Sequence, residues 1–189
     1  QSDITNKSSQ VACEDMIDAP LLSGNGQDGV MFDIVVGNSS DIRIETFWVS
    51  IDTDDDVEIY YKAGSFIGSE GTSGDWTYLD SGFTPGVGDG ATEKIPVNLN
   101  LILTSGDTFG FYITTLNGGM NYTTSSNSVG DVLVSNTDLS LLEGYGVAYP
   151  FGTNYSPRTF NGSAQYCLAN LVSVDENDSN ESASIYPNP

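Results

Sequence analysis

The chain has 189 residues, with 26 Asp and Glu, five Lys and Arg and no His, which is enough for one domain of good size plus terminal segments. The excess of negative charge excludes nucleic acids and anionic membranes as partners, because both would be repelled. The absence of His removes the commonest general base, the usual serine and cysteine triads and His-containing zinc sites. No apolar run approaches the roughly 20 residues of a membrane helix, so membrane insertion is not expected.

The two cysteines, Cys13 and Cys167, lie near the two ends of the strand-rich region. Their even number, the absence of a CxxC motif and an extracellular-looking composition favour a disulfide, with two buried free thiols as the alternative. The bond would close a loop of about 155 residues and contribute about 5 kcal/mol in the chain-entropy model.

The N-terminal residues 1–10 are polar and are predicted to form a flexible segment. No apolar signal region follows Gln1, so either a leader has been removed or the given sequence simply starts at this residue. From Val30 to about Leu168 the dominant hydrophobic period is two, which indicates β-strands.

The first two predicted strands cover residues 30–36 and 41–51. The first places alternate apolar side chains on one face: Val30, Phe32, Ile34 and Val36. The second changes parity, because Ile42 and Ile44 share one face whereas Phe47, Val49 and Ile51 share the other. Either a bulge near Thr46 reconciles the two halves or both faces are buried. Trp48 has the parity of Ile42 and Ile44 and is expected to be buried.

The next long strands are predicted at residues 57–63, 94–103 and 107–115. Their inward residues are Val57, Ile59 and Tyr61 in the first, Ile95, Val97, Leu99, Leu101 and Leu103 in the second, and Phe109, Phe111 and Ile113 in the third. Pro96 has no N–H to donate, so its end of the second strand is expected at a sheet edge.

Shorter strands are predicted at residues 76–82, 131–135, 139–144 and 158–168, with Gly-, Asn- and Asp-rich breaks between the runs. Eight or nine strands without an amphipathic helix predict an all-β fold, an antiparallel β-sandwich. A jelly roll fits the strand count and the long connections, with an immunoglobulin-like sandwich as the alternative. The sandwich domain is assigned to residues 11–172, and residues 173–183 are too acidic and polar to bury a core, so they are predicted to be a linker.

The acidic turn "DTDDDVE" at residues 52–58 contains the sharpest spacing in the chain. Asp52, Asp54 and Asp56 alternate and Asp55 adds a fourth carboxylate. Alternating oxygen ligands suit Ca²⁺, so a structural calcium ion is one hypothesis. Val57 stands where the EF-hand loop has its glycine, and a solvated acidic hairpin turn is the other hypothesis.

Aromatic side chains are the second group of candidates, because flat rings stack on sugars. Strand parity places Tyr60 and Tyr112 on outward faces, and further aromatics lie in or beside predicted loops: Trp76, Tyr78, Tyr145, Tyr149 and Tyr155. For each ring, packing within the fold is the alternative to binding. Arg158 is expected to form a buried or semi-buried ion pair, or else to hold the carboxylate of an acidic sugar.

Catalysis finds little support in the residue pattern. There is no GxSxG motif, no P-loop and no metal triad. A glycosidase needs two placed carboxylates, but the acids lie mainly in Gly- and Asn-rich turns, and no pair is marked out.

The last residues, "SIYPNP" at 184–189, follow the acidic linker. This segment resembles the start of the type A sorting domain of substrates of the type IX secretion system. The resemblance implies export across the outer membrane by that machinery and an extracellular or cell-surface location, with the sorting domain truncated after its first residues. The cargo portion resembles non-catalytic jelly-roll modules of the carbohydrate-binding type.

Taken together, these features predict a secreted or cell-surface module that binds a glycan or a surface partner without catalysis. The alternative is a structural or adhesive subunit that assembles on the cell surface. A carboxylate-dependent enzyme acting on glycans is a third hypothesis.

Overall fold

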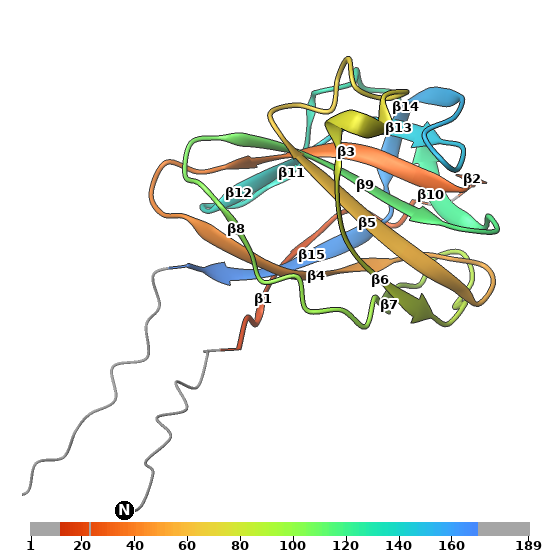
Figure 1. Ribbon diagram of the computed structural model, residues 1–189, viewed down its shortest axis with the longest axis horizontal. Coiled ribbons are helices and arrows are strands. Elements are labelled where there is room, and N and C mark those ends of the chain that lie inside the picture. The colour runs from red at the N-terminus through yellow and green to blue at the C-terminus, as the bar shows by residue number, and fades with distance from the viewer. Residues whose placement is uncertain (1–11, 23, 170–189) are drawn as a thin grey trace, which may run out of the picture.

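The computed structural model describes residues 12–22 and 24–169 as a sandwich of two antiparallel sheets (Figure 1). The smaller sheet has five strands: β1 (Asp15–Asp18), β15 (Gly162–Leu168), β4 (Ile42–Val49) and β7 (Glu93–Lys94) in that order, with β8 (Leu101–Leu103) also paired to β4. The larger sheet has ten strands, and its main path is β2 (Asn25–Gln27), β10 (Met120–Thr124), β14 (Asn154–Phe160), β13 (Gly144–Val147), β3 (Gly29–Val36), β9 (Thr108–Thr115), β5 (Asp55–Ala63) and β6 (Thr77–Thr84). The hairpin of β11 (Val132–Ser135) and β12 (Leu139–Leu142) joins it along β3.

The core lies between the two sheets, and the predicted all-β sandwich is confirmed. The inward residues predicted for 30–36, 57–63 and 107–115 all belong to this core, with Tyr61 at its edge. Period-two alternation identified them because one face of each strand is buried against the other sheet. The one helix in the described ranges is the short 3₁₀ turn η1 (Ser73–Asp75).

Strand β4 contains the predicted bulge. Its register with β15 shifts between the pairs Thr46–Gln165 and Ile44–Tyr166, which leaves Glu45 as the extra residue. Ile42 and Ile44 therefore share the buried face with Phe47 and Val49. The same bulge turns Trp48 away from the core and leaves it half-buried, so the expectation that Trp48 is buried is wrong.

The predicted strand at 94–103 is only partly correct. Its apolar residues do pack on the core, but the strand is broken into β7 and β8. The break has two local causes: Pro96 has no N–H to donate, and Asn100 has a positive φ of 51°. Both pieces pair with β4 at the edge of the smaller sheet, which confirms the edge position expected at Pro96.

Cys13 and Cys167 form the predicted disulfide, with a sequence separation of 154 residues. It ties the residues before β1 to the last strand, β15, with which β1 pairs.

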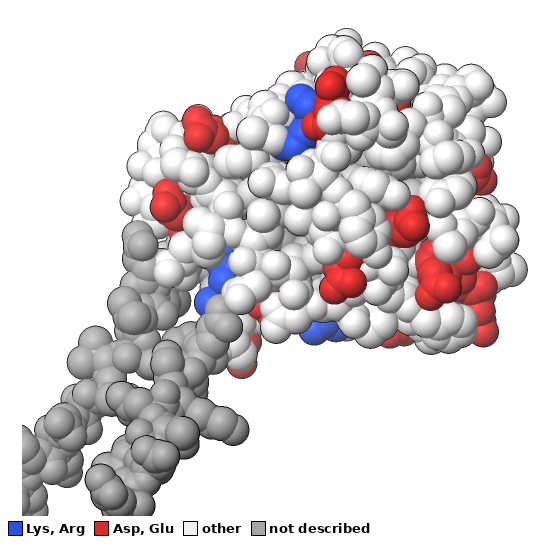
Figure 2. Space-filling view, viewed as in Figure 1, with Lys and Arg blue, Asp and Glu red and all other residues white. Residues whose placement is uncertain are grey.

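Acidic side chains are spread over the face seen in Figure 2, and the largest group of them lies at its right edge, where β5 begins and β6 ends.

Candidate functional site

The outer face of the larger sheet, turned away from the smaller sheet, carries a second hydrophobic cluster that we call the outer aromatic layer. Its buried members are Met31, Phe66, Trp76, Tyr112 and Val147, and its half-buried members are Tyr60, Val129, Tyr145 and Phe151. The members from β3, β5, β9 and β13 occupy the positions that alternate with the core residues. The larger sheet is therefore covered by packed side chains on both faces at β3, β5, β9 and β13.

Residues 64–76 form a loop over this layer, which we call the cover loop, and one buried carboxylate fixes its position. Asp33 accepts hydrogen bonds from the Phe66 N–H at 2.9 Å and from the Ser65 hydroxyl at 2.5 Å. Burial raises the pKa of Asp33 above its usual value, although these two bonds and nearby Lys62 oppose the shift. Gly110 allows the loop to lie this close, because a Cβ there would stand 2.9 Å from the Phe66 nitrogen.

Trp76 and Phe151 complete the cover. The Trp76 indole donates a hydrogen bond to the Ser69 carbonyl at 2.9 Å and lies edge-on to Tyr112. The Phe151 ring lies 4.9 Å from that of Tyr112 and 5.2 Å from that of Tyr60. The aromatic layer is thus packed from the sheet outward and holds the rings at its edge in fixed positions.

The accessible edge of the layer is formed by Tyr60, Tyr78 and Tyr149 around Glu58, and we call it the tyrosine rim. Tyr60 donates its hydroxyl to Glu58 at 2.8 Å, and its ring centroid lies 5.4 Å from that of Tyr78. Desolvation, followed by hydrogen bonding to Glu58, raises the pKa of Tyr60. Desolvation also raises the pKa of Tyr149, with further contributions from the charge of Glu58 and a hydrogen bond to it. A carboxylate held among flat rings can accept hydrogen bonds from a ligand while the rings contact its apolar face.

The structure separates the predicted aromatic residues into different environments. Tyr60, Tyr78 and Tyr149 come together at the rim, and Tyr78 is 49% exposed. Tyr112 is on the predicted outer face but fully buried, and Trp76 is 8% exposed, so neither offers a ring to a ligand. Strand parity gave the face of Tyr112 correctly but could not show that the cover loop lies over it.

The remaining aromatic candidates do not contribute to the rim. Tyr145 is half-buried against Phe66, with ring centroids 5.2 Å apart. Tyr155 is 41% exposed on β14, outside the aromatic layer.

Arg158 does not form the expected ion pair in the part of the chain that the structure covers. Its guanidinium lies 5.6 Å from the centroid of the Tyr122 ring and donates to the Pro157 carbonyl at 2.8 Å. A cation over an aromatic face replaces the carboxylate partner.

Sequence analysis missed three residues of this site: Phe66, Phe151 and Glu58. Phe66 and Phe151 lie in Gly-rich breaks where no period marks a buried position. Glu58 lies on the outward face of β5, and its role depends on Tyr149, which is distant in sequence. The one sequence signal is the segment 149–152, in which two aromatic residues alternate with a proline and a glycine.

The four aspartates of the 52–56 turn do not point at a common centre. Asp52 accepts a hydrogen bond from Asn121, and Asp54 accepts one from the Gly86 N–H. Asp55 is buried and accepts bonds from the backbone and side chain of Asn117, whereas Asp56 is exposed. Alternation along β5 sends neighbouring carboxylates to opposite faces. The calcium hypothesis stays a prediction.

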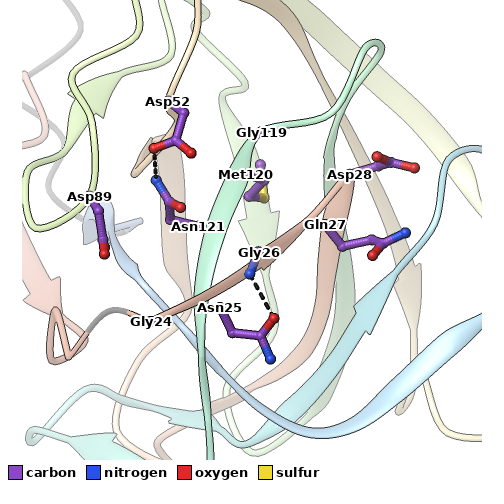
Figure 3. A pocket seen from close by; sticks show the side chains of 10 residues that line it. All are labelled: Gly24, Asn25, Gly26, Gln27, Asp28, Asp52, Asp89, Gly119, Met120 and Asn121. Carbon is purple, nitrogen blue, oxygen red and sulfur yellow. Dashed lines mark hydrogen bonds between the residues drawn. The ribbon is translucent and has the colours of Figure 1, made fainter.

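A pocket of about 470 Å³ lies beside this turn, between β2 and the start of β10 (Figure 3). Figure 3 shows Asp52, bonded to Asn121, across the pocket from Gln27 and Asp28. Asp89 and Asn25 add further polar groups to its lining. The pocket adjoins the tyrosine rim, because Asp28 accepts a hydrogen bond from the Tyr149 N–H at 2.8 Å.

The described residues hold neither a metal-binding cluster of side chains nor a membrane-spanning helix. Among residues 12–22 and 24–169, no cluster of three or more His, Cys, Asp or Glu side chains could hold a metal ion. Over the same ranges no helix is long and apolar enough to cross a membrane. No protein-family model matches the chain, and no curated protein matches its sequence.

The buried tyrosines make the fold sensitive to alkaline pH. Burial raises the pKa of Tyr112 to about 12, above its ordinary value of 10. The folded state therefore holds this proton more tightly than the unfolded chain. The resulting stability is present below pH 10 and is lost as the pH rises through the folded pKa.

We expect the urea midpoint of the wild-type protein to fall between about pH 10 and 12, the window set by these two pKa values. A Tyr112→Phe variant should fall less steeply. It should cost under about 1 kcal/mol at neutral pH, because the hydroxyl, although near Thr114 and the Phe151 backbone, makes no well-aligned bond to a described residue. Identical alkaline profiles for the two proteins would contradict this assignment.

Proposed function

We propose that this protein is an extracellular glycan-binding module and that the tyrosine rim is its binding surface. The single observation that carries the proposal is the position of Glu58, which accepts the Tyr60 hydroxyl beside the half-exposed ring of Tyr78. A sugar presents apolar C–H groups on one face and hydroxyls around its edge. Rings and a carboxylate side by side match both features.

Rigidity of the rim supports the same function. Tyr60 rests on Tyr112 with ring centroids 5.7 Å apart, and both contact Phe151. Binding therefore needs little ordering of the protein, which lowers the entropic cost of association.

Two further observations support the extracellular compartment in this proposal. The disulfide between Cys13 and Cys167 supports an oxidising environment, because disulfides persist mainly outside the cytosol. The resemblance of "SIYPNP" to a type IX sorting domain, which lies outside the described residues, supports export by that machinery. A glycan on a cell surface or in the surroundings would then be the partner.

Replacing Tyr78 with alanine is expected to weaken glycan binding about tenfold or more, which is typical of an exposed aromatic anchor. Candidate ligands should first be found on a glycan array, and affinities then measured by calorimetry for wild type, Tyr78→Ala and Tyr155→Ala. Tyr155 is 41% exposed and outside the aromatic layer, so its variant is the matched control. Equal losses in the two variants, or no glycan bound by the wild type, would contradict the proposal.

A second candidate function is an adhesive subunit that assembles with other sandwiches. The observation that favours it is the position of β6 at the end of the larger sheet, where one side of the strand has no paired strand in the described structure. An edge strand can pair with another chain. Self-association at moderate concentration, measured by analytical ultracentrifugation and unaffected by glycan, would favour this function over the first.

A further inference from the structure

Strand β6 carries two exposed aromatic side chains on the same outer face. Tyr78 pairs across the sheet with Tyr60, and Phe83 pairs with Asp56. Residues 56 and 60 have the same parity on β5, so Tyr78 and Phe83 both point outward. They are 49% and 57% exposed, respectively. An exposed phenylalanine at a sheet edge serves neither the core nor the outer aromatic layer.

The distance between these rings exceeds the size of one sugar. Five residue steps separate them, which at ~3.3 Å per residue is roughly 15 Å, slightly less because Leu79 forms a bulge. A single sugar ring stacked on Tyr78 cannot reach Phe83. A linear chain of several sugars lying along β6 can contact both.

The groups between the two rings are polar and negatively charged. Ser81 pairs with Glu58 in the middle of the strip, and Asp56 lies opposite Phe83 at its end. Lys62, on the same face of β5, is turned to the cover loop, where its ammonium donates to the Ser65 carbonyl at 2.6 Å. Carboxylates and a hydroxyl suit a ligand rich in hydroxyl donors and repel one that carries carboxylates or sulfates.

We infer that β6 provides an extended binding strip, from the tyrosine rim to Phe83, for a linear, uncharged polysaccharide. This inference rests on the proposed function and defines its ligand as a neutral chain of several sugar units. Tyr78 with Tyr60 forms one contact point, Phe83 forms the other, and Glu58 and Ser81 accept or donate hydrogen bonds between them.

The test measures affinity for ladders of neutral gluco- and manno-oligosaccharides, from the monosaccharide upward, with polygalacturonate as the acidic comparison. We expect affinity to rise by about tenfold or more as the chain becomes long enough to reach Phe83. Phe83→Ala should remove this gain while leaving the affinity for the shortest bound ligand unchanged. Tyr78→Ala should weaken ligands of every length, and Tyr155→Ala should weaken none.

The outcomes separate the inference from the proposed function. Two results would contradict the extended binding strip but not glycan binding at the tyrosine rim. They are equally tight binding of short and long ligands, and an unchanged affinity of Phe83→Ala for long ligands. Equal affinity for polygalacturonate would overturn the neutral ligand class. If no glycan binds, the proposed function fails together with the inference. Circular dichroism of each variant checks that it is folded, as expected for substitutions at exposed positions.

Discussion

Replacing both Cys13 and Cys167 with serine is expected to lower the free energy of unfolding by about 5 kcal/mol, the largest change expected here for any substitution. The bond closes a loop spanning 154 residues, so it restricts nearly the whole unfolded sandwich. Loss of the bond gives the unfolded chain more conformations and therefore favours unfolding. Urea denaturation of the oxidised wild type and the double serine variant measures the difference.

The folded state should change mainly at one edge. Strand β1 has four residues, and among the described strands its one partner in the smaller sheet is β15. Without the disulfide, amides of β1 should exchange with solvent faster, relative to global unfolding, than those of β3 and β9. Wild-type protein treated with a reductant is the control and should match the variant. An unchanged urea midpoint in both reduced wild type and variant would contradict the expected role of the bond.

Alternating hydrophobicity predicted which face of each long strand packs against the smaller sheet. Strands β3, β5 and β9 have this pattern because they lie in the middle of the larger sheet over the core. Strand β13, with the sequence GYGV, is too short for its alternation to be recognised: Tyr145 and Val147 face the outer aromatic layer, and Gly144 on the other face must be small, because a Cβ there would lie 1.8 Å from the Met31 carbonyl oxygen. Two glycines in four residues leave only two side chains to mark the strand, which is too few for a hydrophobic period to detect it.

The 158–168 segment shows a related limit. The pattern predicts one strand, but Asn161 separates β14 in the larger sheet from β15 in the smaller one. Phe160 and Ala164 both reach the core, one from each sheet. A continuous apolar pattern therefore persists while the chain changes sheets, because both strands face the same interior.

The candidate site could be predicted only as a set of outward residues. Parity placed the Tyr60 side chain on the correct face. The surroundings of its ring depend on the cover loop, which is hydrogen-bonded to Asp33 and can approach the sheet closely because residue 110 is a glycine. Both contacts join segments more than thirty positions apart, and single residues of this kind have no periodic signature. The same limit applies to the acidic turn, where equal spacing suggested convergence but each side chain found a different partner.

Replacing Asp33 with alanine is expected to destabilise the fold by about 3 kcal/mol and to release the cover loop. The buried Phe66 N–H and the Ser65 hydroxyl would lose their acceptor. Asp33→Asn is the matched control, because its oxygen can still accept from Phe66 and its amide can donate to the Ser65 oxygen. We expect that variant to lose about 1 kcal/mol or less.

Trp76 reports the release directly, because it lies at the end of the cover loop and the chain contains only two tryptophans. In a Trp48→Phe background its fluorescence should shift toward that of solvent-exposed tryptophan in Asp33→Ala but not in Asp33→Asn. Glycan affinity should fall with it, since the rim rests on the layer that the loop covers. Equal spectra and equal urea midpoints for the two Asp33 variants would show that this carboxylate does not hold the loop.

The pH dependence gives a separate check on Asp33. Burial raises its folded pKa, so the folded state binds the proton more tightly than the unfolded chain does. The carboxyl group therefore contributes stability below its unfolded pKa and loses that contribution as the pH rises through the folded value. The stability of wild type relative to Asp33→Asn should consequently be greater at acidic pH than at neutral pH. The opposite trend would mean that the hydrogen bonds to the ionised carboxylate outweigh its desolvation.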